Sequence, residues 1–570
     1  MKFHELAQAF DALEKEPSRL GMTRLLANLF KKATPQEAQI ISYFSLGILQ
    51  APYQGYQLQY GEKSSIKLLA RILAEDEHTV TQRQKKVGDM GLLIQQSAWP
   101  FTDHDLSVEE VYNLLCTFEG ISGTGSQEEK TSYLFLFFSK MDVLSASFVF
   151  RLLSGSMRLG FSDMTVVDAL SWMVSGDKSS RGVIEEAYNL CADIGLIAQR
   201  IKDGGLESLK KMEPILGIPI RPAAAERMES AAAIVKRLGD CVAQPKIDGF
   251  RVQIHIDKKN DKTWFFSRNL LDMSAMFPDI KKEVLKSSCD SCIVEGEAVL
   301  YDEKKEKFLP FQETVKRKRK HGVEQMATDL PLRLYLFDIL YCDGESLLGK
   351  THEERRSTLL SLFGKSGSVR AIEEQKITTA HELEEYFKEQ IKAGLEGVVV
   401  KRPDSTYQAG RRNFNWIKLK RHEEKGAGLN DTIDAVVLGY YKGKGKRAKF
   451  GIGAFLVGLY HREKDQFETV AKVGTGLSDE QWLELKKKCD AHERHEKPVN
   501  VSCAPELEPD VWVYPEITVI IRADEITLSP SHTAGGMALR FPRFIDYCVD
   551  KTPTQVTSVH ELKRLYDIQH

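Results

Sequence analysis

The spacing of apolar residues divides the chain into three regions with different predicted structure. In residues 1–212 apolar side chains recur at intervals of three and four, which predicts amphipathic helices. One helix begins after Ser107, which stands three residues before Glu110 as in a capping box. Residues 146–174 predict two helices that are separated near Gly160. We therefore expect an all-α first domain over residues 1–212.

The pattern changes after residues 213–228, where three prolines interrupt the chain. Strand-like runs then alternate with helical ones, including a helix in which Thr379 and Glu382 have capping-box spacing. The expected strands are residues 249–257, 292–300, 332–341 and 396–402. This alternation predicts an α+β second domain over residues 213–421.

From residue 422 onward, short strands are joined by glycine-rich turns. One helix, capped by Ser478 with Gln481, interrupts them. Many short strands with a single helix are typical of a small barrel, so we expect a C-terminal OB-fold β-barrel over residues 422–570.

A lysine stands directly before the first expected strand, in the stretch QPKIDGFRVQIH from Gln244 to His255. Apolar and polar residues alternate from Phe250 onward, which predicts a half-buried strand, and Asp-Gly supplies the turn before it. Lys246 then lies at the mouth of a sheet, close to Arg251. A neighbouring cation and partial desolvation are expected to lower the pKa of this lysine and make its amine a nucleophile. A surface lysine in an Asp-Gly hairpin is the alternative interpretation.

Carboxylates and cations that suit phosphate chemistry follow in the same domain. Glu295 and Glu297 stand two apart on an expected strand, so both carboxylates face one side of the sheet. Paired acids there are costly unless a cation compensates them. The other candidates are Arg268, Phe337 beside Asp338, Glu396, Lys401, and Lys418 with Lys420. Nucleotidyl transfer needs a nucleophile, metal ligands and cations on the phosphates, and this set provides them.

Overall charge does not identify a partner, but its distribution favours one. The chain has 79 Lys and Arg residues against 81 Asp and Glu, a formal net charge of −2, which is not the overall signature of a nucleic-acid-binding protein. Three basic runs, residues 315–322, 411–421 and 440–450, favour a phosphate-rich partner. A solvated face is the alternative for each run, and a nuclear import signal is a further alternative for the first.

Cysteine usage and hydropathy indicate an intracellular protein. Only Cys289 and Cys292, among nine cysteines, have CxxC spacing, so we expect reduced thiols and no structural zinc site. No apolar run reaches the ~18–20 residues that span a bilayer, and the first 20 residues do not read as a signal peptide. We expect a cytoplasmic location, or the nucleoid in a prokaryote.

In this order, the motifs resemble those of the covalent nucleotidyltransferases, whose signature KxDGxR is present from Lys246 to Arg251. The chain as a whole resembles the ATP-dependent DNA ligases of the archaeal and eukaryotic replicative type. Residues 120–134 and 152–170 are similar to that family's DNA-binding domain, and residues 538–544 are similar to its last motif. The resemblance covers nearly all 570 residues.

The resemblance implies an enzyme that seals nicks in duplex DNA during replication, repair and recombination. The lysine takes AMP from ATP, the AMP passes to the 5′-phosphate at the nick, and the 3′-hydroxyl displaces it. ATP and Mg²⁺ are the implied cofactors, with Mn²⁺ possible, and nicked duplex DNA is the implied partner. The resemblance also implies a monomer, and relatives often use a sliding clamp. Use of ADP, GTP or NAD stays open.

The resemblance assigns roles residue by residue. Lys246 is the nucleophile, Phe337 stacks on adenine, and Gln244 stands where many relatives have an acid that reads the adenine amino group. The expected metal ligands are Glu297, which also lies near the ribose, and Glu396. The residues expected at nucleotide or nick phosphates are Arg251, Arg268, Lys418, Lys420, Arg540, Arg543 and Lys551. The residues expected at DNA are Gly123, Gly125, Ser126, Arg158, Lys444, Lys446 and Arg447.

Two departures from the family pattern matter. Glutamine at position 244 can donate as well as accept a hydrogen bond, so we expect looser discrimination between adenine and guanine. After the last motif relatives usually continue with arginines, whereas this chain has Asp546 and Cys548. These two residues weaken the basic tail and therefore the expected pyrophosphate contacts.

Other protein classes share parts of this pattern. An RNA ligase or an mRNA-capping enzyme has the lysine motif, but neither explains the helical first domain. An NAD-dependent ligase needs a nicotinamide domain and a four-cysteine zinc module, which the sequence lacks. A DNA-binding scaffold without activity predicts decayed motifs, whereas every catalytic position is filled here.

Overall fold

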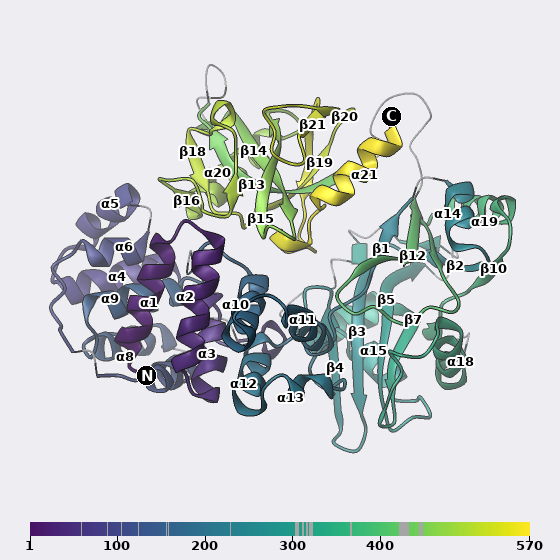
Figure 1. Ribbon diagram of the computed structural model, residues 1–570, viewed down its shortest axis with the longest axis horizontal. Helices are drawn as coiled ribbons and strands as arrows, with labels where there is room; N and C mark the ends of the chain where they lie inside the picture. Colours follow the sequence, from purple (N-terminus) through teal and green to yellow (C-terminus); the bar gives the residue numbers. More distant parts are fainter. Residues whose placement is uncertain are drawn as a thin grey trace.

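The computed structural model describes residues 1–569 except 57, 59, 88, 104, 124, 156, 158, 229, 303–306, 310–312, 315–316, 318–322, 365–366, 421–431, 444–446 and 448–449. Three bodies are visible in Figure 1: helices on the left, a body of strands and helices on the right, and a strand-rich body above them.

The N-terminal part is helical, as the apolar spacing predicts. Ser107 accepts a hydrogen bond from the backbone N–H of Glu110 and so forms the expected capping box of α7. The helical run is interrupted near Gly160, between α9 and α10, as predicted. The apolar faces of these helices share one core. The elements are α1 (Phe3–Lys15), α2 (Arg19–Lys32), α3 (Pro35–Ser45), η1 (Pro52–Gln54), α4 (Glu62–Leu73), α5 (Glu77–Val87), α6 (Met90–Gln95), α7 (Val108–Gly120), α8 (Ser126–Phe138), α9 (Val143–Leu153), α10 (Asp163–Ser175), α11 (Arg181–Leu190), α12 (Ile194–Gly204) and α13 (Glu207–Lys210).

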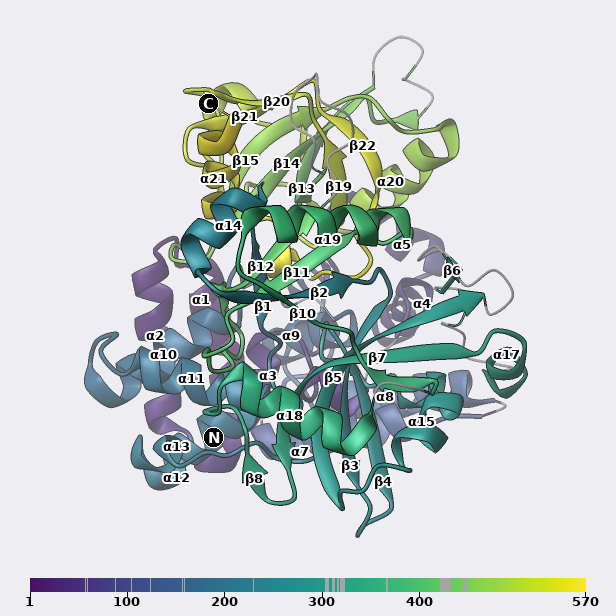
Figure 2. The ribbon, with the colours of Figure 1, turned by 90° about the vertical axis from the view of Figure 1, so that its right-hand side faces the viewer.

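The middle part contains two sheets with helices packed against them (Figure 2). One sheet has the order β1-β12-β11-β2-β10 and the other β4-β3-β5-β7-β8, with β6 beside β5 and β9 beside β7. The strands are β1 (Ala224–Arg227), β2 (Cys241–Lys246), β3 (Phe250–Asp257), β4 (Lys262–Ser267), β5 (Ser291–Asp302), β6 (Lys307–Phe308), β7 (Leu332–Cys342), β8 (Glu345–Ser346), β9 (Val369–Ala371), β10 (Gln375–Ile377), β11 (Gly397–Lys401) and β12 (Arg412–Lys420). The helices are α14 (Ala231–Leu238), η2 (Ser274–Met276), α15 (Pro278–Val284), α17 (Val323–Asp329), α18 (His352–Phe363) and α19 (Ala380–Lys392).

The Asp-Gly turn after Lys246 does not close a hairpin. β2 ends at Lys246 in the first sheet, and β3 begins at Phe250 in the second, so the turn carries the chain from one sheet to the other. The prediction of a half-buried β3 is also wrong, because the polar side chains of Gln253 and His255 are as buried as the apolar ones. Segment 217–220 covers that face, since its backbone N–H groups donate to both side chains.

The C-terminal part is a curled sheet around its own core, to which helix α21 contributes. Ser478 and Gln481 form the predicted capping box of α20. The elements are β13 (Thr432–Tyr441), β14 (Ala454–His461), β15 (Gln466–Val473), α20 (Asp479–Ala491), β16 (Glu493–Arg494), β17 (Val501–Ser502), η4 (Pro505–Leu507), β18 (Val511–Val513), β19 (Thr518–Arg522), β20 (Glu525–Leu528), β21 (Met537–Arg540), β22 (Arg543–Tyr547), η5 (Pro553–Gln555) and α21 (Val559–Gln569).

The predicted fold class is confirmed for all three parts: an all-α N-terminal part, an α+β middle part and a C-terminal barrel of the OB type. The boundaries at residues 212 and 421 stay predictions. All nine cysteines are free thiols, as the sequence suggests. Among the described residues, no helix has the length and apolar character needed to cross a membrane.

Each part contacts both of the others, so the chain forms a closed triangle. The backbone N–H of Ala192 donates to Pro219 between the N-terminal and middle parts. Arg19 pairs with Asp465 (3.3 Å) between the N-terminal and C-terminal parts. Arg564 of α21 pairs with Glu226 of β1 and closes the third side.

One residue of the basic run 315–322 is a core residue and not part of a surface patch. The guanidinium of Arg317 is fully buried and bonds the Asp279 carboxylate (2.8 Å) on α15. It also donates to the backbone oxygens of Met276 (2.9 Å) and Leu330 (2.9 Å). Arg317 is the only residue of the five-residue cationic stretch 316–320 that lies within the described residues, and it fastens α15 to the chain around α17.

Replacing Arg317 by methionine should destabilise the middle part. The change leaves the Asp279 carboxylate without its cation, and because this carboxylate is 21 % exposed the cost is at most about 3–5 kcal/mol, the value for breaking a fully buried pair. The measurement is thermal unfolding of the full chain followed by circular dichroism. Lys281→Ala, which removes an exposed cation from the same helix, should leave the transition where it is. Equal transitions for R317M and K281A would contradict a core role for Arg317.

Candidate active site

The amine of Lys246 lies in a group of charges between the two sheets of the middle part. Gly397 pairs with both Lys246 and Lys420 in the sheet ladder, and this places Glu396 beside the two lysines. One oxygen of Glu396 accepts from Lys246 Nζ and the other pairs with Lys420 Nζ. Burial acts to raise the pKa of Glu396, but the two ammonium groups outweigh it and lower that pKa to about 2. Glu396 is therefore a permanent anion between two cations.

Two glycines allow the backbones around Lys246 to approach closely. A Cβ at Gly249, in the Asp-Gly turn, would lie 2.5 Å from the backbone oxygen of Ala298 on β5. A Cβ at Gly397, whose φ is +148°, would lie 2.0 Å from the backbone oxygen of Leu419 on β12. Both distances are shorter than any real Cβ contact. Glycine at these two positions therefore sets the spacing of the strands on either side of the lysine.

The expected lowering of the Lys246 pKa is wrong for this arrangement. Burial acts to lower the pKa of Lys246, but the Glu396 carboxylate, followed by Glu297 and Asp248, outweighs burial and raises it. Arg251 is close to Lys246 along the chain, whereas Glu396 and Glu297 come from distant positions, so the sequence alone does not reveal their effect on the lysine. The guanidinium of Arg251 instead bonds the carboxylate of Glu295.

Glu297 faces Lys246 from the second sheet. It lies on β5 opposite Arg251 of β3, and one of its oxygens accepts from the backbone N–H of Gly249 (3.2 Å). Burial raises the pKa of Glu297 to about 7, although the charges of Lys246 and Arg251 act to lower it. The lysine thus has a permanently ionised carboxylate on one side and one that titrates near neutral pH on the other.

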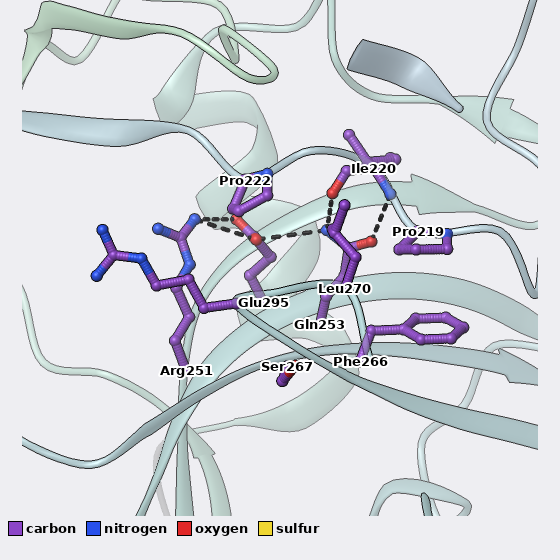
Figure 3. A pocket seen from close by; sticks show the side chains of 10 residues that line it. Pro219, Ile220, Pro222, Arg251, Gln253, Phe266, Ser267, Leu270 and Glu295 are labelled. Carbon is purple, nitrogen blue, oxygen red and sulfur yellow. Dashed lines mark hydrogen bonds and ion pairs between the residues drawn. The ribbon is translucent and has the colours of Figure 1, made fainter. Parts of the chain in front are cut away.

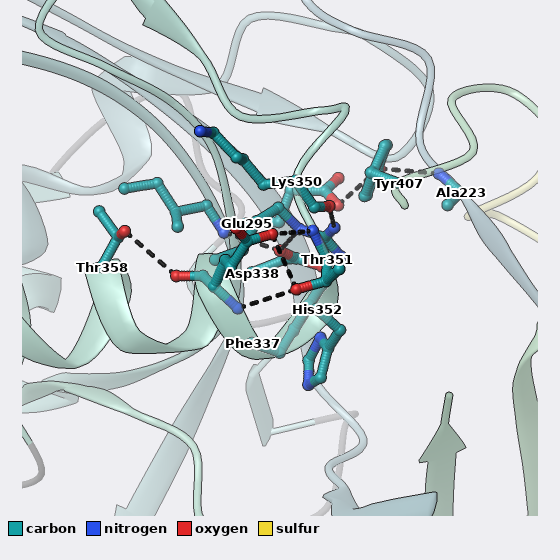
Figure 4. A network of polar contacts seen from close by, with 12 residues as sticks. Ala223, Glu295, Phe337, Asp338, Lys350, Thr351, His352, Thr358 and Tyr407 are labelled. Atoms are coloured by element: carbon teal, nitrogen blue, oxygen red, sulfur yellow. Dashed lines mark hydrogen bonds and ion pairs between the residues drawn. The ribbon is translucent and has the colours of Figure 1, made fainter. Parts of the chain in front are cut away.

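Arg251 is fixed by the other acid of β5, Glu295. Its guanidinium bonds both Glu295 oxygens (2.9 and 3.1 Å), and Tyr407 donates to the same carboxylate (2.7 Å). Figure 4 shows this carboxylate reached by Tyr407, which in turn accepts from Ala223 (2.9 Å). Glu295, which is only 1 % exposed, is therefore a structural counter-ion of Arg251.

A small pocket opens beside Arg251, where segment 219–222 crosses the ends of β3 and β4 (Figure 3). Its lining includes Gln253 and the second predicted phosphate ligand, Arg268, but not Lys246. Within the described part of the chain, Arg268 has no ion-pair partner. Burial and the charge of Arg251 lower the pKa of Arg268. An anion bound here would relieve both effects.

The side chains around Phe337 form an aromatic and cationic wall on one side of the site. Phe337 lies edge-on to Trp416 (6.0 Å between ring centroids), and the Lys401 amine lies 4.2 Å from the Trp416 centroid. Lys401 Nζ also donates to the backbone oxygen of Phe337 (2.9 Å). Asp338, next to Phe337 on β7, forms a buried pair with Arg355 of α18 (2.7 Å).

Gln244 is held by a network that the sequence did not reveal. Its amide nitrogen donates to Glu374 (2.7 Å), and His352 Nε2 lies 2.8 Å from the same carboxylate oxygen. Burial acts to raise the pKa of Glu374, but the His352 hydrogen bond and nearby cations lower it to about 2. An ionised carboxylate only accepts, so it fixes the amide nitrogen of Gln244. No spacing in the sequence links residues 244, 352 and 374.

A carboxylate from the C-terminal part reaches the remaining cations of the site. Glu561 of α21 pairs with Arg412 of β12, and its other oxygen lies 3.7 Å from Lys418 Nζ. Burial lowers the pKa of Lys418 to about 7 although Glu561 acts to raise it. Burial acts to raise the pKa of Glu561, but Lys418 and Arg412 lower it to about 2. The Glu561 carboxylate of α21 thus neutralises part of the positive charge of Arg412 and Lys418.

The structure brings only one of the three predicted residues of the last motif to this site. Lys551 pairs with Asp434, and its pKa is lowered by burial and by the charges of Arg268 and Lys418. Arg540 and Arg543 are more than half exposed and pair with Glu525 and Asp524 on the C-terminal part.

The residues predicted to contact DNA are spread over two parts of the chain. Gly123 and Gly125 have positive φ (+102° and +85°), and Gly125 is the N-cap of α8, which begins at Ser126. Arg447 donates to the backbone oxygen of Gly453 (2.7 Å) and lies over the Trp482 ring. Arg158, Lys444 and Lys446 lie outside the described residues.

Three family models match most of the chain. The family model "DNA ligase N terminus" matches residues 2–171, "ATP dependent DNA ligase domain" matches residues 222–420, and "ATP dependent DNA ligase C terminal region" matches residues 448–551.

Full-length relatives are similar to this chain from end to end. A probable DNA ligase of Dictyoglomus turgidum is 42 % identical over 574 residues, which cover 99 % of this chain and 97 % of the relative. A DNA ligase of Nitrosopumilus maritimus is 36 % identical, covering 100 % and 98 %. A DNA ligase of Saccharolobus solfataricus is 37 % identical, also covering 100 % and 98 %.

Fold and site together define a covalent nucleotidyltransferase, with a lysine at the end of a strand and carboxylates and cations around it. The matches make the class specific: the chain belongs to the ATP-dependent DNA ligases. Enzymes of this family seal nicks in duplex DNA with ATP and a divalent metal ion, in roles that include replication and repair. The predicted family, activity, cofactors and DNA partner are confirmed at this level.

Replacing Glu561 by glutamine should loosen the contact between the C-terminal and middle parts. The change removes the charge that compensates Arg412 and Lys418, and hydrogen bonds to charged groups contribute about 1.5–3 kcal/mol each. Small-angle X-ray scattering at low salt should give a larger radius of gyration for the variant. Added salt should reduce the difference, because it weakens the wild-type contact.

Asp567→Asn is the matched control for this measurement, since it removes an exposed acid from the same helix. It should scatter like the wild type. Identical radii for E561Q and wild type at low salt would mean that Glu561 does not hold the two parts together.

Proposed function

We propose that Lys246 carries the AMP in this DNA ligase. The observation that supports this is the position of its amine at the end of β2, between Glu396 and Glu297 and beside Lys420. Lys246 Nζ attacks the α-phosphorus of ATP; a P–N bond forms, and the P–O bond to pyrophosphate breaks. The AMP then passes to the 5′-phosphate of the nick, which restores the lysine. Attack by the 3′-hydroxyl finally forms the phosphodiester and releases AMP.

Glu297 and Glu396 fit a divalent metal ion, because Mg²⁺ prefers oxygen ligands and these carboxylates face the amine from two sides. Glu297 and Glu396 would hold the ion, which would supply neutralisation of phosphate charge. Carboxylates that are engaged in this way no longer stabilise the ammonium form of Lys246, so the pKa of its amine would fall. The lysine needs this change, since an ammonium group has no lone pair for the attack. Lys246 is thus a cation in the free enzyme, and its amine becomes nucleophilic once ATP and the metal ion are bound.

The cations nearby are proposed to bind phosphate. Lys418 and Lys420 flank the nucleophile on the same face of β12, where they suit the α-phosphate. Arg268 has no ion-pair partner among the described residues, so it suits a nick phosphate. In this arrangement Glu561 pairs with Lys418, so this ion pair has to break before a phosphate can bind Lys418. Arg540 and Arg543 can reach the pyrophosphate only if the C-terminal part reorients.

Adenine recognition is proposed to combine Phe337 with Gln244. The ring of Phe337 supplies a stacking surface. Because Glu374 takes the amide nitrogen of Gln244, the amide oxygen is left as the group that reads the base. An oxygen accepts from the adenine amino group and repels the guanine carbonyl. We therefore propose tighter discrimination than glutamine alone implies.

DNA is proposed to contact the N-terminal part through the start of α8, at Gly123, Gly125 and Ser126, and the C-terminal part through Arg447. The glycines suit this role because positive φ turns backbone N–H groups outward, where they can bond phosphate. A monomer is proposed, since one chain closes on itself through all three parts. A sliding clamp as a further partner stays a prediction.

Labelling with ATP tests the nucleophile directly. The protein is mixed with α-labelled ATP and Mg²⁺ without DNA and run on a denaturing gel. Wild type should carry label that acid releases, because a phosphoramidate is acid-labile, and that nicked DNA discharges. Lys246→Ala should carry none. Lys236→Ala, an exposed lysine nearby in sequence, should label like the wild type. Label on K246A would refute the assignment.

Base discrimination tests the Gln244–Glu374 pair. Glu374→Ala frees the amide of Gln244 to rotate and donate to guanine. The ratio of labelling rates with ATP and GTP should fall about tenfold, which corresponds to about 1.4 kcal/mol. Glu373→Ala, which removes the exposed neighbouring acid, should leave the ratio unchanged. A wild-type ratio in E374A would show that Glu374 does not orient the base-reading group.

A further inference from the structure

Two histidines and a carboxylate, none of which belongs to the site around Lys246, gather where α21 meets the hairpin β14–β15. His461, Glu463 and His560 each offer one ligand atom, and these atoms lie within 4.8 Å of one another. The two imidazole rings are 5.4 Å apart between centroids, and His560 Nε2 lies 3.7 Å from Glu463 Oε1. The three groups thus converge from two segments about 100 positions apart in the sequence.

The backbone holds these segments together independently of the three side chains. A parallel β-bridge joins Tyr460 to Ser558, so the residues that follow on each segment are neighbours. Val559 and Leu562 of α21 then pack into the same core as Leu459 of β14. His461 and His560 are therefore placed side by side by packing, and their proximity does not depend on their own interaction.

His461 is prepared as a ligand. It is 9 % exposed, and its Nδ1 is buried with no hydrogen-bond partner among the described residues. Burial lowers the pKa of His461, against the charge of Glu468 and with that of Lys464. A buried ring nitrogen without a partner has an energetic cost that a ligand would remove.

A second carboxylate lies behind this ring. Glu468 pairs with Leu459 and Gln466 with His461 in the β14–β15 ladder, so Glu468 and His461 lie on one face of the sheet. Glu468 is 2 % exposed; one oxygen takes Lys464 (2.7 Å), and the other has no hydrogen-bond partner among the described residues. Negative charge is thus held next to the cluster, as it commonly is around bound cations.

We propose that His461, Glu463 and His560 bind a transition-metal ion of the Zn²⁺ class. Two imidazoles and one carboxylate form a common donor set for zinc, which leaves a fourth position for water. Mg²⁺ prefers oxygen ligands, so nitrogen donors separate this site from the catalytic carboxylates. His560 and Glu463 are 54 % and 77 % exposed in their side chains, which gives the ion a path from solvent.

Such an ion would strengthen the point at which the three parts of the chain meet. The β14–β15 hairpin reaches the N-terminal helices through Arg462, which pairs with Glu185, and through Asp465. Directly after His560, Glu561 pairs with Arg412 of the middle part. A metal ion that joins α21 to the hairpin therefore fastens both contacts together and favours the closed arrangement.

Cobalt binding to the full chain tests the proposal. Protein stripped with EDTA is titrated with Co²⁺ in excess Mg²⁺, which occupies the oxygen sites, and visible ligand-field absorption is recorded. A saturable band that Zn²⁺ displaces, with one ion bound per chain, is expected. His560→Ala and Glu463→Gln change exposed side chains and should each weaken binding at least about tenfold.

His381→Ala, which removes an exposed histidine from α19, is the control and should bind Co²⁺ like the wild type. Absence of a saturable band in the wild type would overturn the proposal, and so would unchanged binding in both H560A and E463Q. Labelling of Lys246 by ATP is measured on the same preparations, so that loss of metal binding and loss of ligase chemistry are told apart.

Discussion

Positive charge between two sheets is the constraint on which the active site depends. A ligase must gather lysines and arginines to hold phosphates, yet it must also fold before any phosphate is present. The chain meets both demands with counter-ions of two kinds. Glu295 is buried under Tyr407 and stays with Arg251. Glu396 and Glu561 instead pair with lysines that are proposed to bind phosphate. The first kind supports the fold, and the second kind is proposed to give way to the substrate.

This division also explains why the three parts contact one another. Glu561 belongs to the C-terminal part but pairs with Arg412 and Lys418 of the middle part, so one carboxylate joins the two parts and neutralises a lysine that is proposed to bind phosphate. The N-terminal part is linked to the same region through Asp465, one hairpin away from α21. Loss of one contact therefore affects the others, because α21 and the β14–β15 hairpin pack in one core.

Local patterns in the sequence were sufficient for the fold class. Capping boxes at Ser107 and Ser478 and the alternation after Phe250 predicted elements correctly, because caps and periodicity depend on neighbours along the chain. Burial and charge pairing depend on residues far away. The sequence therefore missed that β3 is buried on both faces and that carboxylates raise the pKa of Lys246.

Individual site predictions divide in the same way. Those that rest on strand periodicity, such as Lys418 with Lys420, place side chains on the expected face. The network of Gln244, Glu374 and His352 joins a strand, a loop and a helix, so no spacing could have revealed it. The basic run 315–322 favours a phosphate-rich partner by its composition, but Arg317 pairs with Asp279 in the core. Composition does not distinguish a buried cation from an exposed one.

The two glycines beside Lys246 have a consequence for how such a site can evolve. At Gly249 and Gly397 the space that a side chain would need is taken by a backbone oxygen of another strand, 2.5 and 2.0 Å from the position of a Cβ atom. The side chains of the site can be exchanged without a change in the distance between the backbones. The glycines cannot, because any replacement separates the strands. Divergence of this scaffold is therefore constrained more tightly at the backbone beside the lysine than at the side chains around it.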